Sequence, residues 1–282
     1  MNKPVVMSTT VTVPASSQIW GLSVACTPNP PGTPIPPHSV PAQQAMAKTK
    51  PSLAIRYAGA VLMGQADTLA SIAPCFDSDS AKIRKQRIKK QEESWVLESS
   101  EFARCTTGEE VFPIADDIVS RINHILALYC NFTPMFSVEY INWIDAEGEP
   151  KRTIRDSVSV NVVKSKGISD LKSTSGTQPL GSAVLRLVGL DSAVSEAFAL
   201  HGDSGLSWSQ VYDIIDFVGG VDRIAEAGYA NKKSTSAIRQ TANHHRHLGN
   251  PRKCPLPPNP PTLAEAGEFA RSLLKRWITS RL

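Results

Sequence analysis

The sequence predicts an α+β protein, in which a small strand–helix–hairpin unit is followed by an α-helical bundle domain, behind a disordered, proline-rich N-terminus. Three observations predict this order. Apolar and polar residues alternate between residues 136 and 164, as in strands that have one solvated face. Apolar residues recur at helical spacing over 114–129 and through most of 180–282. Residues 1–51 show neither period and hold ten of the 21 prolines, so they are expected to be disordered.

Composition is that of an ordinary globular protein, with 41% hydrophobic and 20% charged residues. No apolar run reaches the roughly 18 residues that a membrane span requires, and the first residues are too polar for a signal peptide. The odd number of cysteines and the lack of any C-x-x-C argue against a disulfide framework or a four-cysteine zinc site. A reducing compartment, the cytoplasm, is therefore expected. The cysteines are Cys26, Cys75, Cys105, Cys130 and Cys254.

Residues 52–91 are expected to form a helix and a basic linker. A helix is predicted over 53–73, although Gly59 and Gly64 weaken helices. "KIRKQRIKK" (82–90) then places six positive charges in nine residues, directly before Glu92 and Glu93. Such runs are typical of solvated linkers or exposed helices, and a nucleic-acid contact is the alternative.

Residues 92–165 are predicted to be the α+β unit. "SWVLES" (94–99) indicates a short strand, and an amphipathic helix over 114–129 is expected to hold Pro113 in its first turn. Strands at 135–145 and 153–164 are joined by a loop with Gly148 and Pro150 as turn residues. On the second strand one face is shared by Ile154, Asp156, Val158, Val160 and Val162. The helix carries His124, Asp116 and Asp117, which are interpreted as its polar side rather than as an acid–base pair.

After a predicted loop at 167–179, residues 178–282 are expected to fold as a basic α-helical domain. A helix over 191–200 opens on Asp191 as its cap. The next begins with the capping box Ser207–Gln210 and ends at Gly219.

Two more helices close the domain. One covers 234–248 and ends at Gly249, with Pro251 beyond it. The last begins at Thr262, with Glu265 completing a second capping box. Its predicted buried stripe is Leu263, Ala266, Ala270, Leu273, Leu274, Trp277 and Ile278.

Positive charge is concentrated at the C-terminal end. Residues 231–282 carry ten Lys and Arg but only two acids, Glu265 and Glu268, within a chain of formal net charge +4. A basic segment on a mildly acidic body favours an anionic partner, with nucleic acid the commonest. The alternative is a solvated helical surface that the acidic body balances.

The stretch "RQTANHHRHLGNP" (239–251) contains half of the six histidines. At 100° per residue, Arg239, Asn243 and Arg246 fall within roughly 60° of one another and His247 lies beside them, while His244 lies about 140° from Arg239. A core-facing helix has no need of such a polar patch, so solvent or a ligand is expected to satisfy it.

Four interpretations of this stretch remain open. The histidines can be structural, close to helix carbonyls and the negative end of the dipole. Phosphates or RNA can be bound by Arg239, Arg246, Arg252 and Lys253, beside Asn243. A metal site at His244 and His247 would need Cys254 or a distant ligand, and no metal or other cofactor is expected. Finally, a histidine acid/base and a phosphate-binding arginine can cleave RNA without a metal.

The Arg239-x4-His244 spacing in "RQTANH", with the closing helix "TLAEAGEFARSLLKRWI", resembles the HEPN superfamily, helical proteins many of which are ribonucleases. The resemblance covers at most residues 180–282. It implies Arg239 and His244 as the motif pair, and a dimer whose groove lies between protomers. Gln240 departs from the polar Asn, Asp or His often found after the arginine, and Arg246–His247 makes the choice of histidine ambiguous.

Two hypotheses of function follow. In the first, the basic C-terminal domain binds an anionic partner, RNA first, and acts as a HEPN-like, metal-independent endoribonuclease. His244 or His247 would then be the acid/base, with Arg239 and Arg246 as phosphate clamps. In the second, the chain is a non-catalytic interaction or sensor protein, its α+β unit binds a partner, and its histidines are structural.

Overall fold

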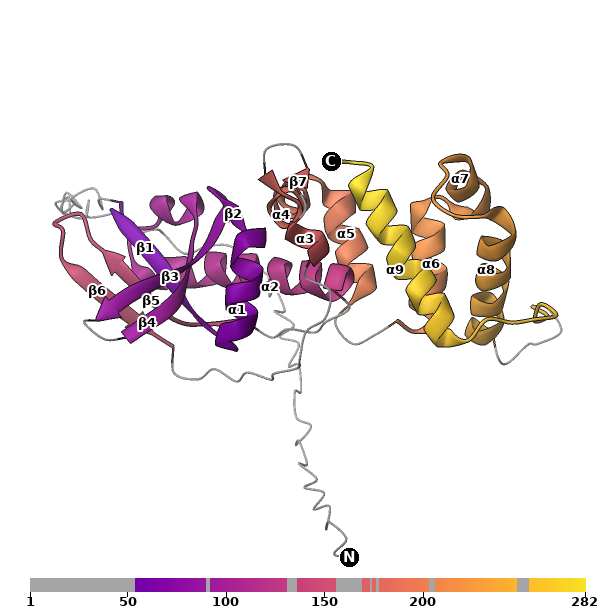
Figure 1. The fold of residues 1–282 in the computed structure, drawn as a ribbon, viewed down its shortest axis with the longest axis horizontal. Helices are drawn as coiled ribbons and strands as arrows, with labels where there is room; N and C mark the ends of the chain where they lie inside the picture. Colours follow the sequence, from indigo (N-terminus) through magenta and orange to yellow (C-terminus); the bar gives the residue numbers. More distant parts are fainter. Residues whose placement is uncertain are drawn as a thin grey trace, which may run out of the picture. The chain divides into compact units, whose positions relative to one another are not determined.

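In a computed structural model, the described part of the chain consists of a six-stranded antiparallel sheet, a second, two-stranded sheet and a set of α-helices (Figure 1). The structure describes residues 54–282 except 90–91, 131–135, 156–168, 173, 176–177, 203–205 and 248–253. The predicted α+β class is confirmed. The predicted leader, residues 1–51, lies outside the described residues, and the described residues belong to one compact unit.

The sheet has the strand order β2-β3-β4-β1-β5-β6, and every neighbouring pair is antiparallel. A second, two-stranded sheet joins β7 to β8. The strands are β1 Tyr57–Met63, β2 Asp77–Ser78, β3 Ala81–Lys89, β4 Glu92–Glu98, β5 Ser137–Ile144, β6 Pro150–Ile154, β7 Thr174–Ser175 and β8 Gln178–Pro179.

The predicted helix over 53–73 is wrong in its first half. Residues 57–63 form the central strand β1, and only α1 (Ala66–Ile72), followed by the 3₁₀ turn η1 (Ala73–Cys75), is helical. The interior of β1 is buried on both faces, so it has the continuous apolar run of a buried strand rather than alternation. Such a short run cannot be told from a buried helix by periodicity alone.

The basic run "KIRKQRIKK" is neither a linker nor a helix, because it forms strand β3. Ile83 points into the core, whereas the cations on either side of it stay exposed. Acidic side chains on the neighbouring strands pair with these cations, and the pairing offsets the repulsion between the closely spaced positive charges. The ion pairs are Lys82–Asp77, Arg84–Glu98 and Lys85–Glu93.

Strand β4 confirms the strand predicted at "SWVLES". Helix α2 (Gly108–Cys130) begins six residues before the predicted 114, so Pro113 lies inside the helix and not in its first turn. The earlier start has a local cause. The Thr107 hydroxyl accepts from the Glu110 amide at 3.4 Å, and the Glu110 carboxylate accepts from the Thr106 amide at 2.7 Å. These bonds satisfy amides that a helix start otherwise leaves unpaired.

The predicted hairpin is confirmed as β5–β6, with Gly148 at a φ of +95° in the loop. Pro150 is the first residue of β6 rather than a turn residue. Ile154 was expected on a buried face but is 68% exposed, because it lies on the edge strand and on the sheet face away from α2. Asp156, Val158, Val160 and Val162 lie outside the described residues.

The helices after the sheet match most of the predicted boundaries. Asp191 caps α5, Ser207 and Gln210 form the predicted box, and Gly219 ends α6 in the left-handed conformation. The second box, Thr262–Glu265, is also present. The helices are α4 Leu180–Leu190, α5 Ser192–His201, α6 Trp208–Val218, α7 Gly220–Glu226, α8 Lys232–Arg246 and α9 Leu263–Thr279.

Three details of this half differ from prediction. The stretch 167–179, expected to be a loop, contains the short helix α3 (Ser169–Lys172) and the strands β7 and β8. Leu263 does not belong to the buried stripe of α9, since it is 40% exposed, while the other six predicted residues are buried. Helix α8 starts at Lys232 and ends at Arg246, and Gly249 and Pro251 lie outside the described residues.

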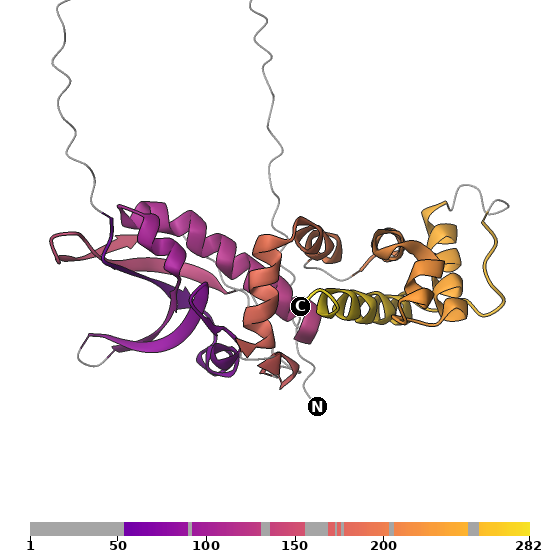
Figure 2. The same cartoon turned by 90° about the horizontal axis from the view of Figure 1, so that it is seen from above.

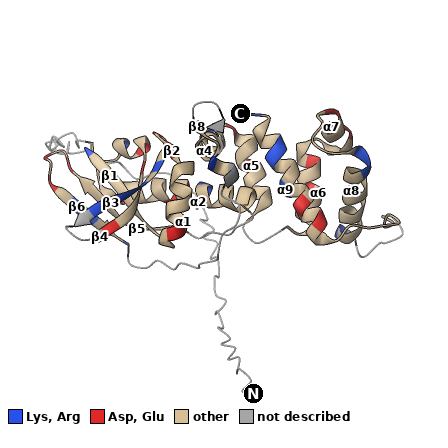
Figure 3. Ribbon diagram, in the orientation of Figure 1, with Lys and Arg blue, Asp and Glu red and all other residues tan. Residues whose placement is uncertain are grey.

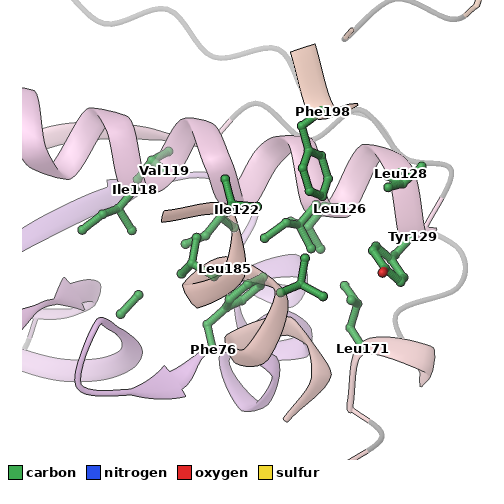
Figure 4. Packing of buried hydrophobic residues seen from close by; sticks show 14 of the residues in the cluster. Phe76, Ile118, Val119, Ile122, Leu126, Leu128, Tyr129, Leu171, Leu185 and Phe198 are labelled. Atoms are coloured by element: carbon green, nitrogen blue, oxygen red, sulfur yellow. The ribbon is translucent and has the colours of Figure 1, made fainter. Parts of the chain in front are cut away.

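Helix α2 connects the two halves. One of its ends packs on β1 and β5 and the other contacts α4, α5 and α9, so a single hydrophobic core runs through both halves (Figures 1 and 2). Figure 4 shows Ile118, Ile122 and Leu126 of α2 facing Phe76 and Leu185. The predicted boundary between 165 and 178 falls where the chain is described only in part, and it stays a prediction. Among the described residues no helix is long and apolar enough to cross a membrane.

Candidate functional site at the α6–α8 interface

Helix α8 carries the arginine–histidine stretch and is held by its N-terminal end and its apolar face. The Asn231 side chain caps it by accepting from the Lys233 amide at 2.8 Å. Thr235, Ile238 and Ala242 are buried along the side that packs against α6 and α7. This packing fixes the rotation of α8, and with it the direction of every polar side chain in the stretch.

Arg239 is directed toward α6. Its Nε donates to Asp216 Oδ1 at 2.8 Å, and an Nη donates to Asp216 Oδ2 at 3.3 Å and to the Tyr212 hydroxyl at 2.7 Å. The guanidinium carbon lies 4.7 Å from the centre of the Tyr212 ring. The hydrogen bond to Asp216 raises the pKa of the Arg239 guanidinium above its usual value. The guanidinium is therefore held by an acid and an aromatic ring from the same neighbouring helix.

Arg246, two turns further along α8, meets the same ring. Its guanidinium carbon lies 4.3 Å from the Tyr212 centroid, and one Nη is 3.4 Å from Asp213 Oδ1. We call Tyr212, Asp213, Asp216, Arg239 and Arg246 the arginine–tyrosine cluster. The expectation that Arg239 and Arg246 share a helix face is confirmed, but α6 satisfies them, where solvent or a ligand was expected.

The histidines make different contacts from the arginines. His244 Nδ1 is 2.6 Å from the Cys254 carbonyl oxygen, so Nδ1 carries the proton and donates it. The ring of His245 stacks on Trp208 with 4.6 Å between centroids and 9° between planes. His247 is exposed at the end of α8. The structure therefore directs Arg239 and His244, the two motif residues, to different neighbours.

Two further side chains bind the segment that follows α8 in the described residues. Asn243 Nδ2 donates to Cys254 Sγ at 3.1 Å, and Gln240 Nε2 donates to the Pro255 carbonyl at 2.7 Å. Together with His244, they hold residues 254–255 along the helix. Arg252 and Lys253, predicted as phosphate ligands, lie outside the described residues.

Five of the ten described lysines and arginines after residue 180 form ion pairs with acidic side chains. Besides the arginine–tyrosine cluster, the ion pairs are Lys232–Asp222, Arg271–Glu268 and Arg281–Asp191. Four of the five aspartates and glutamates come from the chain before residue 231, and Figure 3 shows both signs of charge over α6–α9. Half of the described basic side chains of this region are therefore paired with acids in the fold.

Sequence reasoning missed Trp208, Tyr212, Asp213 and Asp216. A signal was present, because these residues form the partly exposed side of α6 beside its buried stripe. An amphipathic pattern shows that such a side exists but does not identify the helix that it meets. Among the described residues, no group of three or more His, Cys, Asp or Glu is placed to hold a metal ion.

Comparison of the chain with protein-family models, with curated proteins and with solved structures gives no match.

Proposed function

We propose that this chain is a non-catalytic interaction or sensor protein in which α8 has a structural role. The observation that carries the proposal is the engagement of Arg239 by Asp216 and Tyr212. A guanidinium that stabilises a phosphorane-like transition state must present its N–H groups to phosphate oxygens. In this cluster the Nε and one Nη face a carboxylate, which repels a phosphate.

The histidines support the same proposal. His244 donates Nδ1–H to a backbone carbonyl and His245 stacks on an indole ring, contacts that hold segment 254–255 and the end of α8 in place. An acid/base must instead lie within hydrogen-bond reach of the group whose proton it moves. The competing hypothesis is the HEPN-like endoribonuclease, with His244 or His247 as acid/base and Arg239 and Arg246 as clamps. It requires these side chains to converge on one phosphate.

An RNA cleavage assay in EDTA separates the two hypotheses. The purified chain and its Arg239→Ala and His244→Ala variants are incubated with labelled RNA. The matched control is Arg104→Ala, which removes an exposed arginine from the 3₁₀ turn η2 (Ser100–Arg104). We expect no cleavage by any of the four proteins, whereas Arg239→Ala and His244→Ala lower the thermal stability. EDTA-resistant cleavage that both site variants abolish and Arg104→Ala keeps would refute the structural role.

RNA binding without cleavage is a second candidate function, favoured by a groove of about 780 Å³ between α8 and residues 257–259. It is lined by Lys232, Lys233, Ser236 and Gln240, which offer donors to a phosphate backbone, and by proline rings. If RNA lies there, its affinity falls steeply with salt, and Lys233→Glu weakens it about tenfold or more. Affinity independent of both salt and Lys233 would exclude the groove. The dimer implied by the HEPN resemblance stays a prediction, which light scattering tests.

A further inference from the structure

A cavity of about 540 Å³ lies at one end of the six-stranded sheet, remote in sequence from α8. It exists because β1 and β4 pair at only two positions, Ala60 with Leu97 and Val61 with Val96. Toward Tyr57 on β1 and Glu98 on β4 the ladder between these strands ends, although β1 stays paired with β5 as far as Tyr57. The gap between the two strands opens into the cavity.

Backbone hydrogen bonds fix the walls. The Ile55 amide donates to the Cys105 carbonyl at 2.9 Å, and the Ser100 amide donates to the Asp79 carbonyl at 2.8 Å. These bonds tie the start of β1 and the β2–β3 turn to η2 and its flanking residues. Ile55, Ala58 and Phe102 supply buried apolar surface. A cavity of this size, with an apolar floor and preset walls, has the form of a small-molecule site.

Polar side chains on the open face of the sheet line one side of the cavity. The Tyr57 hydroxyl lies 2.8 Å from Glu98 Oε1, and Arg84 forms an ion pair with the same carboxylate. Gly59 permits this arrangement, since a Cβ at residue 59 would approach the Tyr57 hydroxyl oxygen to 2.7 Å. Glu98 is thereby bound from two sides, and Arg84 and Tyr57 are held at the cavity by a shared partner.

The charge of the lining points to the ligand. Three cations line the cavity; Arg84 is paired with Glu98, and Lys82 is paired with Asp77. The third, Arg56, is exposed and forms no ion pair with a described acid, and its Nη1 lies close to Gly148 in the β5–β6 loop. A guanidinium binds carboxylates and phosphates through paired N–H groups. Of the two carboxylates in the lining, Glu98 is paired with Arg84, so Asp79 is the one that opposes an anion there.

We infer that this cavity binds a small organic anion, a carboxylate or phosphate on an apolar body, with the anionic group at Arg56 and the body on Ile55, Ala58 and Phe102. The inference goes beyond the proposed function, because neither hypothesis for α8 assigns a ligand to the sheet. The two sources of the anionic group, carboxylate and phosphate, are separated by the choice of probe.

The test is titration calorimetry of the full chain with phenyl phosphate and benzoate as probes and inorganic phosphate and phenol as comparisons. We expect saturable binding of at least one of the two probes in the millimolar range, and at least tenfold weaker binding of the two comparisons, each of which lacks one half of the ligand.

Four variants locate the binding. Arg56→Gln should lower the affinity for the better probe about tenfold. Asp79→Asn should raise that affinity, because it removes a charge of the same sign as the probe. Ala103→Trp places an indole at the exposed rim of the cavity and should abolish binding, whereas the neighbouring Arg104→Gln, outside the lining, should leave it unchanged. No saturable binding of either probe overturns the inference, as does binding that Arg56→Gln and Ala103→Trp leave intact in variants with wild-type circular dichroism.

Discussion

The ring of Tyr212 is shared by two guanidinium groups, those of Arg239 and Arg246, which lie two turns apart on α8. Each arginine also has its own aspartate on α6, so the cluster joins α6 to α8 through charge, hydrogen bonding and ring contact together. Because these side chains are more than a third exposed or close to it, solvent screens their ion pairs. The cluster is accordingly expected to stabilise the interface moderately.

Arg239→Ala tests this role. Loss of the carboxylate pair and of the contact with Tyr212 should lower the free energy of unfolding by about 1–2 kcal/mol, and Arg239→Lys should cost less because it keeps the charge. Urea denaturation at neutral pH measures both variants. Unchanged stability of Arg239→Ala would show that the guanidinium contributes nothing to the fold and is available for a ligand.

Tyr57 makes stability depend on pH at the alkaline end. Burial, with a contribution from the hydrogen bond to Glu98, raises the pKa of Tyr57 to about 12, against about 10 in the unfolded chain. The unfolded state therefore releases this proton first. The stabilisation is complete below about pH 10 and is lost as the pH rises through about 12.

The Tyr57→Phe variant isolates this effect. Tyr129, whose pKa burial also raises to about 12, contributes the same trend and is left in place. We expect the free energy of unfolding of the native chain to fall more steeply between about pH 10 and 12 than that of Tyr57→Phe. Parallel curves for the two proteins would contradict the predicted shift.

At the scale of single elements, capping chemistry fixes where helices begin. Thr262 caps helix α9, because its hydroxyl accepts from the Glu265 amide and the Glu265 carboxylate accepts from the Thr262 amide at 2.7 Å. The hydrogen bonds that the Thr262 amide and hydroxyl donate to the Glu265 carboxylate lower the pKa of Glu265. The pattern is local in sequence, so it can be read without knowledge of the fold.

Removal of this cap has a predictable cost. Thr262→Ala should destabilise the chain by about 1 kcal/mol, whereas Thr262→Ser keeps the hydroxyl and should cost little. Ser272→Ala, an exposed change inside the same helix, is the control for helix propensity. Thermal denaturation of the three variants measures the effect; equal melting temperatures for Thr262→Ala and Thr262→Ser would contradict it.

Strand prediction failed where tertiary contacts decide the secondary structure. Residues 57–63 form a strand because β4 and β5 lie on either side of them, and 81–89 form one because acids on β2 and β4 offset their charge. Hydrophobic periodicity within one segment reports neither the strands that flank β1 nor the acids that pair with β3. The helices after residue 190 were predictable because their stripes and caps are local.

For the whole molecule, α2 is the element that both halves share. Ile122 and Leu126 are almost completely buried where the sheet side and the helical side of the core meet (Figure 4). A substitution there removes packing from both halves at once. The continuity of the core therefore predicts that the described part of the chain unfolds as one cooperative unit.

Ile122→Ala tests this continuity. We expect this substitution to lower the free energy of unfolding by about 2–5 kcal/mol. Unfolding should remain a single transition with the same midpoint for both halves. Fluorescence of Trp95 and Trp143 reports the sheet, and that of Trp208 and Trp277 reports the helices. Each pair is observed with the other pair and Trp20 replaced by phenylalanine. Two separated midpoints in the otherwise native chain would show that the halves unfold independently.

The sequence by itself determined the α+β class, the β5–β6 hairpin, the helix caps at Asp191, Ser207 and Thr262, and the common face of Arg239 and Arg246. Each depends on residues a few positions apart, whose relation the backbone period fixes. Only the tertiary structure decided that Asp213 and Asp216 meet those arginines, and that β1 and β4 separate beside Tyr57. Which helix or strand becomes a neighbour depends on the packing of the whole core, because burial of apolar surface favours contact without specifying a partner.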